Sequence, residues 1–487
     1  MTQATPLASG QNITKQHPSF ADQQLRWKLP LTLLGGTQAM RLARENYLPK
    51  GRNEQEDSYE DRLNGTVLDN YFKRTVMSLA DLPTGQPVVI NEPDELGQIL
   101  LENADRQGTN LTRYTNRCLS DMAVFGMSHT LTTYPTAPQR KEGEEEPAPM
   151  TQQQRLDADI RPYFIRIPPD CLFWWDHNDL GDLTEIRYEE KAQDSYAINL
   201  RSQQGGAATK MEIGIQENSR VVQWTPSMVT RWKRDQNAWA VESETVNALG
   251  YIPLRTAYAG QPIAPFVIDP PLETLADLNG LHWRQSSHQL QIELVNRNPL
   301  LVMRDLVPAD VQAFSVGPYT AIAIDKSNAD NAIEFIETAG KAVELGRAGL
   351  EALEKRMEGL SQAPLTLRPG NPMTATEVIV NDAKSVSDLE SWTNELENTL
   401  KDASGDASQW ETSRFEPAEI NISRDFETLP NAGHLDAIAE DYEVGAITLE
   451  TYLYERSRYG LYSDEFDPKA EAERVRQAQP APTSADE

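Results

Sequence analysis

The segment Ser361–Pro372, SQAPLTLRPGNP, separates two long stretches of helical periodicity. Before it, apolar residues recur every three or four positions at Leu350, Leu353, Met357 and Leu360. After it, the same period continues through Ile379, Ala383, Val386, Leu389, Thr393, Leu396 and Leu400. Such a stripe predicts a packed helix on each side. The prolines of the segment exclude a helix there, because each removes a backbone donor and clashes with the preceding turn. We therefore predict a stiff loop between two packed helices.

Upstream of this loop, a small β unit is bracketed by two helices. Leu272 to about Val295 has helical spacing and ends at Asn298-Pro299. Short strands are expected at Leu300–Met303, Tyr319–Ile324 and Ile333–Ile336. The order helix, strands, helix predicts an inserted tip carried on a two-helix stalk.

Residues 160–260 change to a two-residue period with β-branched and aromatic side chains. The expected strands are Tyr163–Ile167, Leu172–Trp175, Leu183–Glu189, Met211–Ile215, Arg220–Lys233, Trp239–Glu242 and Ile252–Tyr258. They follow one another without intervening helices, which predicts an antiparallel sheet and an α+β fold. Helical patterns precede them, over Asp57–Ala80 and from Asn91 to about Thr133.

The remaining segments are short elements or polar stretches. Pro135–Gln152 contains four prolines and the acidic run Glu142–Glu146, which predicts a solvated, mobile loop. Near the other end, Ile420–Phe426 suggests a strand, and His434–Gly445 and Leu449–Tyr459 suggest short helices. Composition predicts disordered tails at both ends, and the N-terminal residues lack the pattern of a secretory signal. No apolar run approaches the roughly 18 residues that span a membrane.

The formal net charge is −29, from 74 acidic and 45 basic residues. Such an excess keeps a protein soluble and makes its copies repel one another. It also repels nucleic-acid phosphates, so it suits a protein that lets DNA pass and does not suit one that grips it. Cys118 and Cys171 are expected to be unpaired, as in a reducing compartment.

Recognisable catalytic chemistry is missing from the sequence. The GxxxxGK[ST], GxSxG, HExxH and paired CxxC patterns do not occur. The segment Trp174–Asp179, WWDHND, could be imagined as a metal or acid–base site. No further ligand follows at a diagnostic spacing, so we favour a strand with packed tryptophans that ends in an Asx-rich turn. We therefore expect no enzymatic activity, no metal and no cofactor.

Several local patterns, taken in order, resemble one family. They are Gly36-x-x-x-Met40-Arg41, Tyr47-Leu48-Pro49, Tyr59-x-x-Arg62, Gly250-Tyr251-Ile252-Pro253, Tyr258-Ala259-Gly260, Leu275-x-x-Leu278-Asn279, Thr374-Ala375-Thr376-Glu377 and Ser423-Arg424-Asp425-Phe426. Their order across about residues 30–460, together with the order of the predicted elements, resembles a podophage-like subfamily of the portal (head-to-tail connector) proteins of tailed bacteriophages.

The resemblance implies a portal fold divided into named parts. They are an N-terminal tail (1–19), a wing (20–268) with a flexible acidic loop (135–158), stem helices (269–295 and 339–360), a small α/β clip (296–338), a tunnel loop (361–374), a wing helix (375–410), a helical crown (411–470) and a C-terminal tail (471–487).

The resemblance also implies a function. About twelve copies would form a ring at one capsid vertex, through which double-stranded DNA is packaged and ejected. The implied partners are the terminase large subunit, a tail adaptor, and the major capsid and scaffolding proteins, with no membrane. The implied location is the virion, and the host cytoplasm during assembly. A non-portal head–tail adaptor or minor capsid protein is the alternative, and a head-associated hydrolase is a more distant one.

Seven residues are the candidates for contact with DNA. In the tunnel loop they are Gln362, Thr366, Arg368 and Asn371, and on the second stem helix they are Arg347, Lys355 and Arg356. That helix would be roughly 30 Å long, enough for a channel wall. Arg368, the only charge in the loop, would contact phosphate or instead bond carbonyls of a neighbouring subunit. Contacts to DNA should be to its backbone, because a conduit must pass every sequence.

Overall fold

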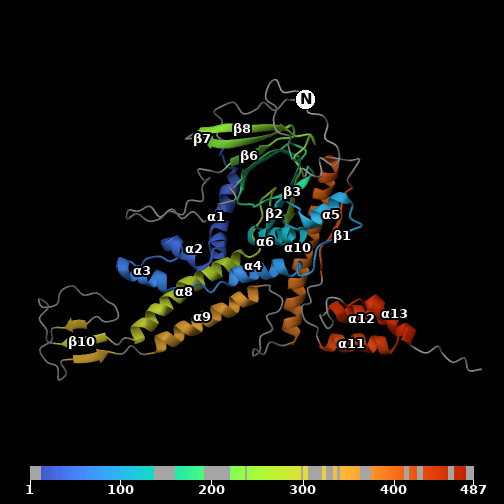
Figure 1. Cartoon of the computed structure of the whole chain (residues 1–487). Helices are drawn as coiled ribbons and strands as arrows, with labels where there is room; N and C mark the ends of the chain where they lie inside the picture. The colour runs from blue at the N-terminus through green and yellow to red at the C-terminus, as the bar shows by residue number, and fades with distance from the viewer. Residues whose placement is uncertain are drawn as a thin grey trace, which may run out of the picture. The chain divides into compact units, whose positions relative to one another are not determined.

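The computed structural model describes residues 13–135, 160–190, 220–235, 238–297, 300–304, 321–324, 333–336, 340–361, 375–410, 416–424, 432–458 and 466–478 (Figure 1). The chain divides into two compact units. The first contains Met1–Pro364 and Gly370–Ser423, and the second is formed mainly by Arg424–Glu487. The fold is a mixture of helices and mainly antiparallel sheets, as the sequence predicts.

The first unit begins with a layer of helices. They are α1 (Pro18–Leu34), α2 (Gly36–Ala43), the 3-10 turn η1 (Arg44–Asn46), α3 (Glu56–Gly65), α4 (Tyr71–Asp81), α5 (Glu95–Glu102) and α6 (Leu111–Phe125). The predicted single helical stretch Asp57–Ala80 is therefore two helices. The chain is extended at Thr66, and the Asn70 side chain caps α4 by accepting from the Lys73 amide.

Order begins earlier than the predicted tail 1–19 allows. Ile13 is buried, and the His17 amide donates to the Phe173 carbonyl at 2.8 Å. The His17 side chain also caps α1, which starts at Pro18. The prediction of a disordered tail up to residue 19 is wrong for residues 13–19. It was based on composition, which cannot reveal that one side chain is buried or that another caps a helix.

The prediction of helix from Asn91 to Thr133 is wrong for its last turns. Helix α6 ends at Gly126, which has φ 83° in the left-handed region. A Cβ at Gly126 would lie 2.7 Å from Ile268 Cγ2, so the position requires glycine both for its backbone and for space. The chain then continues as strand β2 (Met127–Thr133), in which every residue is buried. A strand buried on both faces lacks the alternation by which strands are recognised.

Two antiparallel sheets follow where one was expected. The first has the order β3-β2-β9, with β3 at Tyr163–Ile167 and β9 at Leu254–Tyr258. The second has the order β4-β5-β6-β7-β8. Its strands are β4 (Leu172–His177), β5 (Leu183–Glu190), β6 (Arg220–Trp224), β7 (Met228–Asp235) and β8 (Ala238–Val246). The predicted strand Arg220–Lys233 is thus a hairpin, and Met211–Ile215 lies outside the described residues.

The core of the first unit lies between the helices and the three-stranded sheet. Trp27 of α1 is buried and meets Phe125 of α6 edge to face, with ring centroids 5.2 Å apart. Helices α6 and α10 (Ala375–Trp410) both contact β2, and α10 also contacts β9. Cys118 and Cys171 are buried and form no disulfide in the described part of the chain, as expected.

The predicted stalk and tip are present as helices and strands. Helix α8 covers Glu273–Arg297 and α9 covers Lys341–Leu360. Between them lie β10 (Leu300–Arg304), β11 (Ala321–Ile324) and β12 (Ile333–Ile336). Strand β10 is central, parallel to β11 and antiparallel to β12. Their assignment as stem and clip stays a prediction.

A short strand joins distant parts of the first unit. Strand β13 (Glu419–Asn421) pairs antiparallel with β1 (Val89–Asn91). The first unit therefore extends to Ser423, whereas the predicted crown starts at residue 411. The prediction of a strand at Ile420–Phe426 holds only for its first residues, and 425–431 lie outside the described residues.

The second unit contains helices α11 (Ala432–Glu443), α12 (Leu449–Arg458) and α13 (Pro468–Ala478). The prediction of a disordered tail over 471–487 is wrong for its first residues, since α13 extends to Ala478. Pro468 opens the helix, and the Asp467 carboxylate accepts from the amides of Lys469 and Ala470. The charged composition of this segment suggested disorder, whereas the cap and the buried Ala472 show that it is a helix. Over the described part of the chain, no helix is long and apolar enough to cross a membrane.

Candidate functional site

Helices α8 and α9, the predicted stem, form an antiparallel pair joined by polar contacts at three levels. His282 Nε2 lies 3.1 Å from Glu354 Oε1. Further along, Gln289 Nε2 donates to the Val343 carbonyl at 3.1 Å. The third contact is an ion pair of 3.0 Å between Arg347 Nε and Glu293 Oε1.

Apolar contacts complete the pairing. On α9, Met357 is fully buried and Leu353 is 8% exposed. The closest approach is at Gly346, where an added Cβ would overlap the Gln289 carboxamide. Of the apolar stripe predicted on α9, Leu353 and Met357 are buried, whereas Leu360 is 38% exposed.

The other side of α8 is fixed to the N-terminal helices. The Asn279 side chain accepts from the Phe72 amide at 3.0 Å and donates to the Asp69 carbonyl at 2.9 Å. Gly280 lies against Leu29, and Trp283 is fully buried. The Leu275-x-x-Leu278-Asn279 pattern is thus a packing motif that holds α8 on the helical layer.

A buried arginine adds a second anchor for α8. Arg62 of α3 donates two hydrogen bonds of 2.7 Å to the Glu54 carboxylate, and it also reaches Ser287 of α8 at 3.3 Å. This contact lowers the pKa of Glu54, with the Arg62 hydrogen bonds as the main cause. Charges buried in this way are stabilised by being paired.

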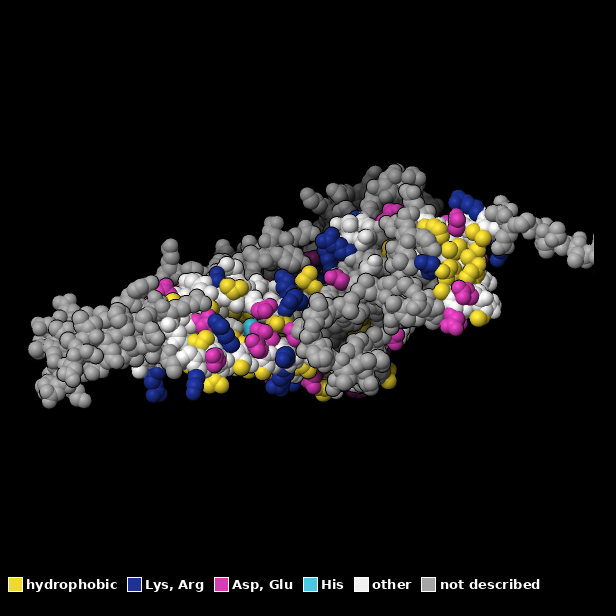
Figure 2. Space-filling view, turned by 90° about the horizontal axis from the view of Figure 1, so that it is seen from below, with side chains coloured by type: hydrophobic (Ala, Val, Ile, Leu, Met, Phe, Trp, Pro, Cys, Tyr) yellow, Lys and Arg dark blue, Asp and Glu magenta, His cyan; other side chains and the backbone are white. Residues whose placement is uncertain are grey.

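The three predicted channel residues of α9 differ in their surroundings. Arg347 is exposed, yet its charge is matched by Glu293 of the same subunit. Lys355 and Arg356 are exposed and have no ion-pair partner within the described residues. Acidic and basic side chains are interspersed over the α9 side of the pair, seen from below in Figure 2. Gln362, Thr366, Arg368 and Asn371 lie outside the described residues, as does most of the acidic loop 135–158.

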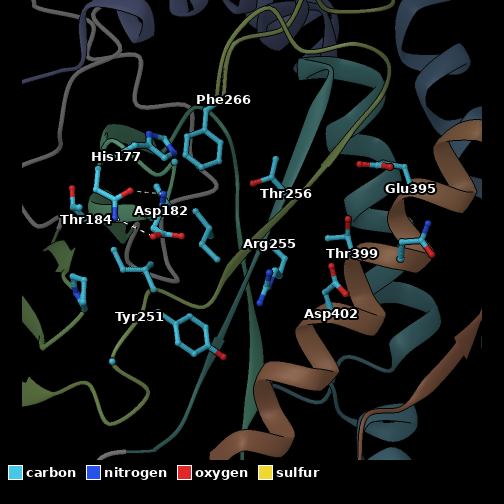
Figure 3. Close-up of a pocket in the computed structure, with 18 residues that line it drawn as sticks. His177, Asp182, Thr184, Tyr251, Arg255, Thr256, Phe266, Glu395, Thr399 and Asp402 are labelled. Atoms are coloured by element: carbon cyan, nitrogen blue, oxygen red, sulfur yellow. Dashed lines mark hydrogen bonds between the residues drawn. The ribbon is translucent and has the colours of Figure 1, made fainter.

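Helix α10 follows the predicted tunnel loop, and a cluster of hydrogen bonds attaches it to β9 and the loop before β9. Tyr251 and Arg255 point toward α10 and, with residues of that helix, line a cleft of about 880 Å³ (Figure 3). The Asp406 carboxylate, which is fully buried, receives two hydrogen bonds of 2.7 Å from Arg255 and one of 2.8 Å from Tyr251. The pKa of Arg255 is raised, chiefly by these hydrogen bonds. The sequence did not predict this hydrogen-bond cluster, because a lone aspartate in a polar stretch gives no signal that it is buried.

The segment Trp174–Asp179 has the structural role that the sequence favoured. Trp175 is buried in β4, and the Asn178 carboxamide oxygen accepts from the Leu180 and Asp182 amides in an Asx turn. His177 lies over Phe266 with centroids 5.9 Å apart, and burial lowers its pKa. No group of three metal-binding side chains occurs among the described residues.

Comparisons with known proteins place this chain near one uncharacterised family. A family model described as a domain of unknown function (DUF4055) matches residues 271–411. The matched segment starts just before α8 and ends just after α10, so it contains the helix pair, the three strands and the long helix. No curated protein matches the chain.

Solved structures with a similar trace come from gene transfer agent particles. The neck of an empty particle computed with C6 symmetry has 10% identity and a TM-score of 0.40, covering 86% of this chain and 98% of that one. The neck of a native particle with C12 symmetry has 9% identity and a TM-score of 0.37, covering 80% and 89%. A native virion has 10% identity and a TM-score of 0.38, covering 86% and 98%. Likeness at these values defines neither fold nor function, so the proposal that follows depends on this chain's own residues.

Proposed function

We propose that this chain is the subunit of a portal ring of about twelve copies, located at one vertex of a phage capsid. The observation that carries the proposal is the α8–β10–β11–β12–α9 arrangement, a helix pair that brackets a three-stranded unit and is followed by a 36-residue helix. This is the order of stem, clip, stem and wing helix in the family that the sequence resembles.

The stem pair has the properties of a ring wall. Helix α8 is fixed to the helical layer on one side and to α9 on the other, which leaves the opposite face of α9 exposed. That face carries Ala342, Leu345, Ala348, Gly349 and Ala352, and Leu345 is 74% exposed. Small residues allow the close approach of a neighbouring subunit or of the channel contents. The 20 residues of α9 give a wall roughly 30 Å long.

The charges suit passage of DNA without capture. A net charge of −29 on each copy repels phosphate over most of the surface. Lys355 and Arg356, which have no partner among the described residues, and Arg368 in the tunnel loop provide sparse contacts with the DNA backbone. Such contacts carry no sequence information, as a conduit requires.

The remaining parts have roles in assembly in this proposal. The β10–β12 unit docks the terminase large subunit during packaging and a tail adaptor afterwards. The wing meets the major capsid and scaffolding proteins, so the protein is part of the virion after assembly in the host cytoplasm. In this proposal the terminase, and not this chain, hydrolyses the nucleotide.

Deletion of Ser361–Pro372 tests the channel role. Purified protein with the deletion should still form rings in electron micrographs, because the stem and wing contacts are untouched. Particles assembled with it should retain less packaged DNA after nuclease treatment than wild-type particles. A deletion of equal length in the acidic loop, residues 140–151, is the control. Unchanged DNA retention in the Ser361–Pro372 deletion would exclude the channel role of this segment.

A further inference from the structure

The three faces of α8 have different surroundings. Consecutive residues of a helix point about 100° apart, and His282, Trp283 and Arg284 show the three directions in turn. His282 contacts Glu354 of α9, whereas Trp283 is fully buried on the side that packs on the N-terminal helices. Arg284 is exposed, and so is His288, four residues later on the same face. One face of α8 therefore remains open, and it carries the charge of Arg284.

Helix α9 has an acidic face on the opposite side of the helix pair. Glu344, Glu351 and Glu358 are seven residues apart, which is about two turns, so they share one face. Burial raises the pKa of Tyr71 on α4, and the nearby charge of Glu358 raises it further. The acidic face therefore lies on the side of the N-terminal helices, whereas Arg284 points away from them.

These charges are not matched inside the subunit. Arg284, Glu344 and Glu351 are exposed, and no described residue forms an ion pair with any of them. Copies with a net charge of −29 repel one another, so a contact between two copies needs opposite charges that face each other. The helix pair carries these charges on opposite sides, as a head-to-tail contact requires.

The positions of the charges along the pair also agree. Within the subunit, His282 is level with Glu354, and Gln289 is level with Gly346. Rotation about an axis parallel to the pair keeps each residue at its height, so the same register applies between neighbouring copies. Arg284 of one copy is then level with Ala352 of the next, and Glu351 is only about 1.5 Å away along the axis.

We propose that a second copy of this chain binds to the open face of α8, with Arg284 of one copy paired with Glu351 of the next. The second copy presents the acidic face of its α9. Each copy thus provides Arg284 to one neighbour and Glu351 to the other. This inference rests on the proposed ring and names the contact that closes it.

Disulfide cross-linking of the full-length protein tests the contact. A chain with both Arg284→Cys and Glu351→Cys should give covalently linked multimers on mild oxidation, seen on a non-reducing gel. The matched control combines Arg284→Cys with Glu344→Cys, which is on the same face of α9 but about 10 Å further along the axis. The control should give about tenfold less linked multimer, because the Cα atoms of a disulfide lie within about 7 Å of each other. Cys118 and Cys171 are buried and are the same in both variants.

Exchange of the two charges is a second test. Arg284→Glu and Glu351→Arg each place like charges opposite one another in neighbouring copies. Each should raise the protein concentration needed for ring assembly by about tenfold, and the double variant should restore the wild-type concentration. Both positions are exposed, so thermal unfolding of the subunit should not change. That measurement separates a loss of assembly from a loss of folding.

Two results would overturn this contact while the ring remains. One is a chain with Arg284→Cys and Glu351→Cys that forms normal rings in electron micrographs but cross-links no more than the control. The other is a double charge variant that assembles no better than the single variants. Failure of the wild-type protein to form rings would contradict the proposed function itself, and this contact with it.

Discussion

Arg255 on β9 donates two hydrogen bonds to Asp406 on α10, residues that are 151 positions apart in the chain. Asp406 is fully buried, whereas the Arg255 side chain is 39% exposed. The carboxylate is thus removed from water and satisfied by the guanidinium and the Tyr251 hydroxyl. This contact fixes the C-terminal half of α10 on the sheet, and with it the helix that follows the predicted tunnel loop.

Replacement of Asp406 by Asn should destabilise the first unit. The amide keeps the shape but loses the charge-assisted bonds to Arg255, which typically contribute about 1.5–3 kcal/mol. We expect the free energy of unfolding in urea to fall by that amount. The same measurement on Glu390→Gln, half-buried on the same helix, should show a change of less than about 0.5 kcal/mol. Equal midpoints for Asp406→Asn and the wild type would mean that the contact does not hold α10.

The free energy of unfolding should decrease as the pH is lowered, because the buried His129 is protonated more readily in the unfolded chain. This residue is 1% exposed, and its Nδ1 lies 2.8 Å from Thr256 Oγ1. Burial lowers its pKa to about 3, from the ordinary histidine value of 6.5. The unfolded chain therefore binds a proton between these values that the folded chain does not, so stability is present above pH 6.5 and is lost as pH falls below it.

The size of this effect at pH 5 is about 2 kcal/mol relative to pH 7. Urea unfolding at half-unit steps between pH 7 and 5 measures it. His129→Gln should flatten the dependence, although it also lowers stability at pH 7. His288→Gln, exposed on α8, should leave the slope unchanged. A wild-type slope that persists in His129→Gln would assign the dependence to other groups.

The stem pair should depend on Met357. Its side chain is fully buried, and Met→Ala substitutions at such sites cost about 2–5 kcal/mol. Leu345 on the same helix is 74% exposed, so Leu345→Ala should change the stability of the subunit little. Thermal unfolding of the two variants separates the packed face of α9 from its open face. Equal losses would show that both faces are packed within the subunit.

Lys355 and Arg356 should matter more for DNA than Arg347. The double variant Lys355→Ala, Arg356→Ala removes two exposed charges that have no ion-pair partner among the described residues, so rings should form while retained DNA decreases. Arg347→Ala removes a charge that Glu293 already matches, and its effect on DNA should be smaller. Nuclease-protected DNA per particle is the measurement. The opposite order of effects would place the channel on another face of α9.

Helices with a clear stripe could be predicted from the sequence, and so could strands with alternation. The predicted helix over Leu272–Val295 corresponds to α8 at Glu273–Arg297, and the strand at Tyr163–Ile167 matches β3. On α8, exposed positions such as Asp277, Arg284 and His288 recur between buried ones, which is the condition that makes a helical period visible. The antiparallel arrangement followed from strands without intervening helices.

The errors have a common physical origin in burial that composition does not register. Every residue of strand β2 is buried, so its sequence shows no alternation, and the predicted helix was extended through it. Gly126, which caps the C-terminus of α6, marks the true end of that helix. The short helix α13 looked like a charged tail because, among its described side chains, Ala472 alone is buried. The charges of the two stem helices could be read from the sequence. The pairing of Arg347 with Glu293 could not, because it depends on how the two helices pack against each other.

Class averages of the purified protein by electron microscopy test the central claim most directly. The account predicts closed rings of about twelve subunits with a central opening, in which labels attached at residue 366 lie near the symmetry axis. A uniform population of monomers in both low and high salt, or rings with the label at the outer rim, would contradict it.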